Sequence, residues 1–420
     1  MPVPDWGLLD PLWTGAVDDA AILDALVTVE SALAEAWGHR VSLTAEGLDL
    51  VAIGAGTKAG GNPVIPLVGQ LRDQAGEAED WVHRGATSQD ILDSAIMIVA
   101  SRAVATTQAS LTASAQFLAA LADTHRHDVM VGRTLGTHAA PITFGTKASS
   151  WLDGITVARK ALGSLELPVQ LAGAVGTGAA FLDLGGDPAA LRASLAERLG
   201  LADPGRSWQA ERSPVALLAS ALSLTLGALG RIATDVLVLA RTEVGEVAEG
   251  SGGTSSAMPQ KQNPTTAILI RSAALQSAGL LATVHSSLIT EDERPSGAWH
   301  TEWLALRSLL RLAIEASDAA ARMLGSLTID TARMRANLDL NGGIAWAEHA
   351  QSLLTVTLGR AAANAVVSRA VKQVSPELPF GAALAAELDG EIVDLSDDSI
   401  FASADAVITA ALRRHEGASS

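Results

Sequence analysis

The chain has 420 residues, of which 48% are apolar and 18% charged, and this composition excludes an intrinsically disordered protein. Its net charge of −17 argues against nucleic acid or a membrane surface as a partner, although a local cluster of basic residues can still bind a small anionic substrate. Cysteine is absent, which excludes disulfides and thiolate metal sites, so we expect a cytoplasmic protein.

Long spans without helix-breaking residues dominate the chain. Residues 86–131 and 298–324 contain neither glycine nor proline, and residues 215–250 contain no proline. Residues that favour helix, such as Ala, Leu and Glu, are frequent there. A helix of about 35 residues is about 50 Å long at ~1.5 Å per residue. We therefore expect a mainly α fold with a central bundle of long helices that continues into neighbouring subunits, the alternative being a curved bundle within one chain.

Composition changes along the chain suggest three domains. We expect an N-terminal helical domain over residues 1–95, a central long-helix bundle over 96–335 and a small C-terminal helical domain over 336–420. The strand signals are short and isolated, at 181–186 and 389–396. The uncharged stretch 213–230 is long enough for a membrane helix, but it contains hydroxyl residues and its helical pattern continues beyond it. We therefore expect a buried core helix there.

The stretch VHRGATSQDILDSA over residues 82–95 places polar side chains at the start of a long helix. Thr87 and Asp90 have the spacing of a capping box, which is the structural interpretation of this stretch. The same stretch gathers hydrogen-bond donors at a helix N-terminus, which suits carboxylate binding: His83, Arg84, Thr87 and Ser88.

A second polar stretch, GRTLGTHAAPITFG, covers residues 132–145. His138 stands three residues before Pro141, where we expect a helix to start. A single histidine is more often structural than catalytic, but Arg133, Thr134 and Thr137 beside it favour a functional role. His125 and His127 do not predict a metal site, because positions i and i+2 of a helix face apart.

A third stretch, EGSGGTSSAMPQKQNPTT, interrupts the helical pattern over residues 249–266. Asn263 and Pro264 indicate an N-cap and a first helical residue, and the following helix N-terminus favours an anion. Lys261 adds a positive charge, and Ser255 and Ser256 lie in flexible backbone. The functional interpretation is a mobile loop that closes on a carboxylate and presents a serine as proton acceptor. The alternative is an ordinary linker followed by a helix cap.

Together, these three stretches resemble the signature regions of the fumarase/aspartase/argininosuccinate lyase superfamily. The signature loop of that superfamily is G-S-S-x-M-P-x-K-x-N-P, and TSSAMPQKQNP over 254–264 carries it almost intact. The resemblance covers essentially the whole chain. It looks closest to the bacterial 3-carboxy-cis,cis-muconate cycloisomerase branch, through residues 7–38, 81–95, 168–181 and 293–306.

The resemblance implies a three-domain superfamily fold with a tetrameric helical core, active sites shared between subunits of a homotetramer, and no cofactor or metal. It implies a reaction on a small carboxylate through an aci-carboxylate intermediate. Ser255 would be the base, Ser256 its supporting hydroxyl, Lys261 the charge that stabilises the intermediate and His138 the acid on the leaving-group side. The implied substrate-binding residues are His83, Arg84, Thr87, Ser88, Arg133, Thr134, Thr137, Gln170, Arg212, Met258, Asn263 and Arg294.

Some residues depart from the branch and point to a changed substrate. Gln260 stands where many relatives carry His, His300 where Gln is usual, and Arg84 where Trp is common; Gln209 lies in WQAER, which replaces a pattern closer to W-H-T-x-R-D. The first candidate function is 3-carboxy-cis,cis-muconate lactonisation. The alternative is a C–N lyase that releases fumarate from a substituted succinate, nitrosuccinate or adenylosuccinate among them. A third hypothesis is a non-enzymatic homologue, against which the retained Ser255, Lys261, Asn263 and His138 argue.

Overall fold

The structure, a computed structural model, describes residues 9–250, 253–254, 258 and 261–417. The chain folds into two compact units, each assembled from three separate stretches. Unit 1 contains Met1–Ser110, Ala158–Gly227 and Ser272–Asp318, and unit 2 contains Leu111–Val157, Ala228–Arg271 and Ala319–Ser420.

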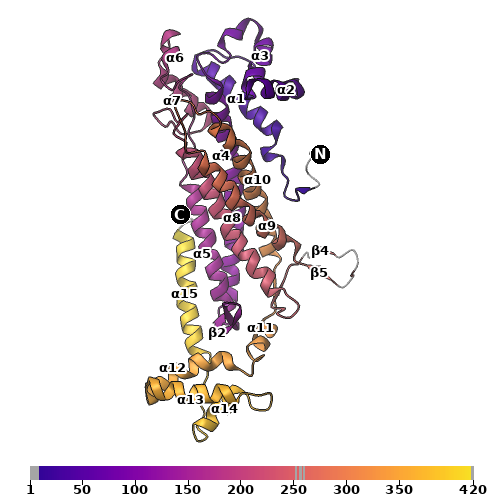
Figure 1. Cartoon of the computed structure of the whole chain (residues 1–420), viewed down its shortest axis with the longest axis vertical. Coiled ribbons are helices and arrows are strands. Elements are labelled where there is room, and N and C mark those ends of the chain that lie inside the picture. Colours follow the sequence, from indigo (N-terminus) through magenta and orange to yellow (C-terminus); the bar gives the residue numbers. More distant parts are fainter. Residues whose placement is uncertain (1–8, 251–252, 255–257, 259–260, 418–420) are drawn as a thin grey trace. The chain divides into compact units, whose positions relative to one another are not determined.

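Five helices contribute residues to both units, and Figure 1 labels each of them. They are α4 (Ser88–Thr124), α5 (Phe144–Gly163), α8 (Ser213–Leu239), α9 (Thr265–Ser286) and α10 (Ala298–Gly325). Unit 1 adds α1 (Asp19–Ala36), α2 (Leu50–Gly60), α3 (Val64–Ala75), α6 (Ala179–Asp183), α7 (Pro188–Leu199) and the 3-10 helices η2 (Gly15–Val17) and η3 (Gly76–Trp81).

Unit 2 adds the strands and the C-terminal helices. The strands are β1 (Val129–Thr134), β2 (Thr137–Thr143), β3 (Val247–Ala248), β4 (Gly253–Thr254), β5 (Gln262–Asn263) and β6 (Thr328–Ile329). The helices are α11 (Thr331–Leu338), η4 (Ile344–Trp346), α12 (Ala347–Leu358), α13 (Arg360–Gln373), α14 (Phe380–Glu387) and α15 (Asp398–Gly417). The strands form three antiparallel pairs, β1 with β2, β3 with β6 and β4 with β5.

The mainly α fold class is confirmed, and the breaker-free spans coincide with helices. The span 86–131 contains α4, and the span 298–324 is α10. In α8, the side chains of Leu218, Leu222 and Leu226 are fully buried, so this apolar helix belongs to the core, as expected. Helices α8 and α9 are both long and apolar enough to cross a membrane by length and composition alone. In the most apolar 18-residue stretch of each helix, 61% of α8 is buried inside the protein and 28% of α9.

The strand signals at 181–186 and 389–396 are wrong. Residues 181–183 belong to α6, and residues 391–396 have no regular structure. Apolar runs this short do not distinguish strand from helix by periodicity. The boundaries of the three expected domains are not tested by this division into units and stay a prediction.

The hairpin β1–β2 was not foreseen, and the expected helix start at His138 is wrong. His138 lies in β2, paired with Arg133 of β1, and the helix starts only at Phe144. Pro141 is tolerated in β2 because a two-stranded ribbon leaves edge positions at which no N–H is needed. The turn residues Leu135 and Gly136 both have positive φ, as a tight two-residue hairpin turn requires.

Within unit 2, Gly145 lets the start of α5 approach the end of α4. A Cβ at this position would lie 2.6 Å from the carbonyl oxygen of Ala122 and 2.8 Å from that of His125. We therefore expect Gly145→Ala to lower the free energy of unfolding by about 1–3 kcal/mol, because backbone atoms cannot move aside as a side chain can. Denaturant unfolding followed by circular dichroism measures this change.

Gly154 in the same helix provides the control. A Cβ added at Gly154 would lie 3.7 Å from its nearest neighbour, the Ala228 methyl group, which is an ordinary van der Waals contact. Gly154→Ala should therefore leave stability unchanged or raise it by up to ~1 kcal/mol. Equal effects of the two substitutions would contradict the close approach at Gly145.

Candidate active site

In unit 1, the N-terminus of α4 joins two of the predicted substrate-binding residues. The Nη1 group of Arg294 donates a hydrogen bond to the hydroxyl of Thr87 at 2.8 Å. Thr87 immediately precedes Ser88, the first residue of α4, and its backbone N–H donates to the Asp90 carboxylate at 3.0 Å. Of the two hydrogen bonds of a capping box, the one from the Thr87 N–H to the Asp90 side chain is formed. The Thr87 hydroxyl, which would accept the other, accepts from Arg294 instead.

The carboxylate of Asp90 is fully buried and accepts hydrogen bonds from several segments. The donors are the backbone N–H groups of Thr87, Ala172 and Gly173 and the side-chain amides of Gln170 and Gln209. Burial raises the pKa of Asp90 above its ordinary value, and the hydrogen bonds oppose that shift. Asp90 therefore fixes the loop around Ala172 against the start of α4.

Gln170 has a structural environment. Its side chain is fully buried, its amide donates to Asp90 at 3.2 Å, and its Oε1 accepts from the backbone N–H of Trp208 at 2.9 Å. These contacts support a role in building the loop rather than in direct contact with a substrate.

Arg212 is also buried, in a cluster of charges. Its guanidinium donates to both oxygens of Asp93, at 2.7 and 3.1 Å, and to Glu302. Burial acts to lower the pKa of Arg212, but the two carboxylates outweigh it and raise the pKa. Burial raises the pKa of Glu302, and the like charge of Asp93 adds to that shift. Like Gln170, Arg212 occupies a structural position.

His83 is held by a carboxylate that the sequence did not single out. The Nδ1 atom of His83 lies 2.7 Å from Oε1 of the fully buried Glu30 in α1, and its backbone N–H donates to Oε2 of Glu30 at 2.9 Å. His83 has φ of 62°, a conformation that is unfavourable for a residue with a side chain. Glu30 thus fixes both the backbone and one ring nitrogen, which leaves Nε2 as the nitrogen that can meet a substrate.

Arg84 is held between two indole rings. Its guanidinium carbon lies 4.5 Å from the ring centre of Trp81 and 5.3 Å from that of Trp37. The Trp37 indole N–H donates to the carbonyl oxygen of Arg84 at 3.2 Å, and the Arg84 Nε is buried without a hydrogen-bond partner in the described part of the chain. The stacking orients the cation without neutralising it.

In unit 2, the hairpin carries His138 and Arg133 at paired positions. The Arg133 guanidinium binds the fully buried Glu246 carboxylate through two hydrogen bonds, at 2.7 and 2.9 Å, and Asn337 donates to Glu246 at 2.7 Å. Burial lowers the pKa of His138, the positive charge of Arg133 lowers it further, and Glu246 partly opposes both. Burial and the Arg133 charge therefore both favour the neutral form of the imidazole.

The turn of this hairpin contains the other two candidates. Thr134 and Thr137 are paired across it, and the Thr137 hydroxyl donates to the carbonyl oxygen of Thr134 at 3.1 Å. Leu135 between them is fully exposed. Both threonines are exposed at the tip of the hairpin, where their hydroxyls remain accessible as acceptors.

The signature loop is described in part. Ser255 and Ser256 lie outside the described residues, as does Gln260. Strands β4 and β5 flank this stretch, with Thr254 opposite Gln262 and Gly253 opposite Asn263. Lys261 is exposed, and its backbone N–H donates to the carbonyl oxygen of Met258 at 3.0 Å.

The helix that follows this loop differs from the expectation. Asn263 lies in β5, and α9 begins at Thr265, so Pro264 occupies the N-cap position predicted for Asn263. The Glu249 carboxylate accepts from the backbone N–H groups of Thr266 and Ala267, at 3.2 and 2.7 Å. Two of the N–H groups expected to bind a substrate anion are therefore already bound within the chain.

No group of three or more metal-ligating side chains occurs in the described ranges. His125 and His127 each face an acidic residue instead. The Nδ1 of His125 lies 2.7 Å from Asp128, and the Nε2 of His127 lies 3.3 Å from Asp405.

Comparison with known proteins decides the family. A family model described as lyase matches residues 20–279. The chain is 44% identical over 401 residues to a nitrosuccinate lyase from Streptomyces davaonensis, which covers 88% of this chain and 84% of that protein.

The chain belongs to the fumarase/aspartase superfamily of lyases. It is also 36% identical over 405 residues to a 3-carboxy-cis,cis-muconate cycloisomerase from Pseudomonas aeruginosa, which covers 90% of this chain and 88% of the relative. The crystal structure of a 3-carboxy-cis,cis-muconate lactonizing enzyme from Pseudomonas putida matches with a TM-score of 0.88 at 32% identity, covering 96% of both chains. The protein is therefore an enzyme, a lyase or cycloisomerase of this superfamily.

The superfamily resemblance named the basic and hydroxyl residues but missed the acidic ones that position them. Glu30 holds His83, Glu246 holds Arg133, and Asp93 and Glu302 hold Arg212. A signal was available for Glu30, the one charged residue in the mainly apolar run LVTVESALA. Two of the residues that depart from the branch contact backbone carbonyl oxygens. Gln209 is buried and donates to the carbonyl oxygen of Gly173, and the Nε2 atom of His300 lies 3.0 Å from the carbonyl oxygen of Gly61.

Removing Arg212 should leave two buried carboxylates without their counter-charge. We expect Arg212→Ala to lower the free energy of unfolding by about 3–5 kcal/mol. Arg206 is the control, because its ion pair with Glu211 is half-exposed on both sides. Arg206→Ala should change stability by only about 0–1 kcal/mol. Chemical denaturation measures both, and similar losses would refute the structural role of the Arg212 cluster.

The lowered pKa of His138 has a consequence for pH dependence. The unfolded chain binds a proton at His138 at higher pH than the folded chain does, so this residue reduces stability as pH falls below about 6.5. A titration of its ring protons by NMR, assigned with His138→Gln, should give a midpoint below ~6.5. Arg133→Gln should move the midpoint upward, and a downward move would contradict the assigned cause.

Proposed function

We propose that this enzyme cleaves a C–N bond by β-elimination, with nitrosuccinate as the substrate and fumarate and nitrite as the products. The 44% identity to a nitrosuccinate lyase across 88% of the chain carries this proposal. The identity to the cycloisomerase is lower, at 36% over a similar length.

The chemical step balances without a cofactor. A base removes a proton from the carbon beside one carboxylate, and the electron pair forms the aci-carboxylate. Collapse of this intermediate forms the C=C bond of fumarate while the C–N bond breaks and nitrite leaves with its electron pair. We assign the base to Ser255, with Ser256 as its supporting hydroxyl and Lys261 and Asn263 stabilising the extra charge.

The state of His138 supports an anionic leaving group. Burial and the charge of Arg133 lower the pKa of His138, which favours the neutral imidazole over the cation that would protonate a departing amine. Nitrite, like a carboxylate, leaves as a stable anion and needs only a hydrogen bond. This argument favours nitrosuccinate over aspartate-like or adenylosuccinate-like substrates.

The charged groups of unit 1 support recognition of the substrate carboxylates. Arg294 and the Thr87 hydroxyl are joined beside Ser88 at the start of α4, where backbone N–H groups also favour an anion. Arg84 is oriented by its two indole neighbours and keeps its charge. We assign carboxylate binding to these groups, with His83 orienting the substrate through Nε2.

Lactonisation of 3-carboxy-cis,cis-muconate is the second candidate, favoured by the TM-score of 0.88 with the lactonizing enzyme. In that reaction a carboxylate of the substrate adds to a double bond and the resulting carbanion is protonated, so no external leaving group is needed. In this reaction Ser255 would return the proton instead of removing it, and it would act with the same Lys261 and His138.

The proposal includes a cytoplasmic homotetramer with active sites shared between subunits. Large apolar side chains on the long helices support subunit contacts, since Leu217 of α8 is 62% exposed and Leu275 of α9 is 70% exposed. Leu135 at the hairpin tip is a further exposed apolar side chain.

Oligomeric state can be tested at Leu275. Sedimentation should give the mass of four chains, and Leu275→Lys should reduce it because a charge would be buried in an apolar contact. Glu416, an exposed residue near the end of α15, offers a control position, where Glu416→Lys should leave the mass unchanged. A monomeric wild-type enzyme would refute the shared-site model.

Substrate and base can be tested together. Purified enzyme should release nitrite and fumarate from nitrosuccinate, with no loss of absorbance from 3-carboxy-cis,cis-muconate. Ser255→Ala should reduce turnover by at least about 10³-fold while leaving helicity and oligomer size unchanged. Turnover of the muconate alone would replace the first candidate by the second, and full activity of Ser255→Ala would refute the base assignment in both.

A further inference from the structure

In unit 1, the guanidinium of Arg294 is held on two sides and keeps its charge. Its Nη1 group donates to the hydroxyl of Thr87 at 2.8 Å, and its guanidinium carbon lies over the indole ring of Trp299, 5.3 Å from the ring centre. The nearby carboxylate of Glu291 accepts from the backbone N–H and the hydroxyl of Ser296 instead. Within the described ranges Arg294 forms no ion pair, so its charge is available to an anion.

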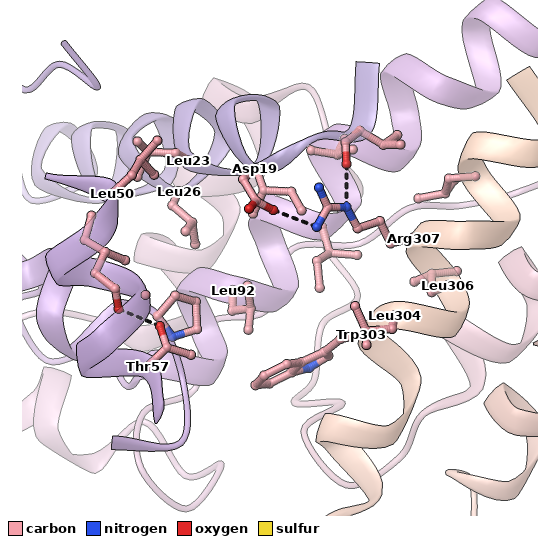
Figure 2. A pocket seen from close by; sticks show the side chains of 18 residues that line it. Asp19, Leu23, Leu26, Leu50, Thr57, Leu92, Trp303, Leu304, Leu306 and Arg307 are labelled. Carbon is pink, nitrogen blue, oxygen red and sulfur yellow. Dashed lines mark hydrogen bonds and ion pairs between the residues drawn. The ribbon is translucent and has the colours of Figure 1, made fainter. Parts of the chain in front are cut away.

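The ring of Trp299 is fixed by its own contacts. Trp299 is only 2% exposed, and its indole N–H donates to Oδ1 of Asp93 at 2.9 Å. Asp93 is itself buried and also accepts two hydrogen bonds from Arg212, so it cannot turn away from the indole without losing them. Trp303 meets Trp299 edge to face, with ring centres 4.8 Å apart, and extends from α10 toward Leu92 of α4 (Figure 2). The indole therefore offers a face of fixed orientation to the guanidinium above it.

These contacts join the starts of two helices. Thr87 immediately precedes α4 and Asp93 lies in its second turn, while Trp299 is the second residue of α10 and Arg294 lies in the loop before it. One hydrogen bond from Arg294 and one from Trp299 therefore connect the two helix starts. The guanidinium is thus placed beside the N-terminus of α4 before a ligand arrives, and the bond to Thr87 leaves other N–H groups of the arginine for that ligand.

We propose that Trp299 is a positioning residue, which holds Arg294 in the orientation that receives a carboxylate of the substrate. The proposal rests on the proposed function, in which Arg294 binds such a carboxylate. The face of the indole attracts the cation without neutralising it, and the stacked side chain loses less conformational freedom when the carboxylate binds. In this role Trp299 acts through Arg294 and needs no contact with the substrate.

Binding of succinate to the full-length enzyme, measured by calorimetry without turnover, tests this role. Succinate carries the two carboxylates of the proposed substrate and no leaving group. Trp299→Leu removes the aromatic face and should weaken succinate binding ~5-fold, as the loss of a cation–π contact would. Trp299→Phe keeps an aromatic face and should lose less affinity. Both variants lose the hydrogen bond to Asp93, so the difference between them reports the contribution of the face.

A double-mutant cycle separates positioning from a purely structural effect. In an Arg294→Gln enzyme, which keeps a hydrogen-bond donor, Trp299→Leu should cause no further loss of succinate affinity.

Trp151→Leu is the matched control. Trp151 of α5 is only 1% exposed, and its indole N–H also donates to a carboxylate, that of Asp235, at 2.7 Å. In the described part of the chain, no Arg or Lys lies over its ring. Trp151→Leu should therefore lower the midpoint of chemical denaturation, as Trp299→Leu does, and bind succinate as the wild type does.

The outcomes distinguish this role from the proposed reaction. An equal loss of affinity from Trp299→Leu in the wild-type and Arg294→Gln enzymes, or no loss in either, would overturn the positioning role. Absence of succinate binding by the wild-type enzyme would refute the carboxylate site and the positioning role together. The expected cycle without release of nitrite from nitrosuccinate would support the positioning role and refute only the reaction.

Discussion

The buried carboxylate of Asp90 is the interaction on which the candidate site in unit 1 depends. It accepts from the N-cap residue Thr87, from two backbone N–H groups of the loop at 172–173 and from two glutamine side chains. Because these donors come from three parts of the sequence, the carboxylate fixes the loop and the helix start relative to each other. Loss of this group would leave several buried donors without an acceptor.

Other acidic residues work in the same way throughout the chain. Glu30 sets the backbone and tautomer of His83, Glu246 binds Arg133, and Glu249 occupies two N–H groups at the start of α9. The net charge of −17 is therefore compatible with an anionic substrate. Many of the acids are used internally, while cations such as Lys261 remain exposed.

The helical architecture followed directly from the sequence, because spans without glycine or proline have few alternatives to helix. The signature TSSAMPQKQNP and the capping pattern at Thr87 likewise indicated the family and one helix start. The hairpin around His138 was missed, since its tight turn depends on positive φ at Leu135, a residue that does not ordinarily signal a turn. The structural positions of Gln170 and Arg212 could not be read from the sequence either. Their partners lie far away along the chain and are brought near only by folding.

The division of the chain into units constrains how this enzyme can be cut. Each of the five boundaries between the stretches, from Ser110 in α4 to Asp318 in α10, lies inside a long helix rather than in a linker. A fragment ending at such a boundary would lose the remaining turns of its helix, and a fragment made of one stretch would lack the other two stretches of its unit. Neither half is therefore a candidate for separate expression. Insertions and new termini are better placed at exposed loop positions such as Gly205 and Arg206.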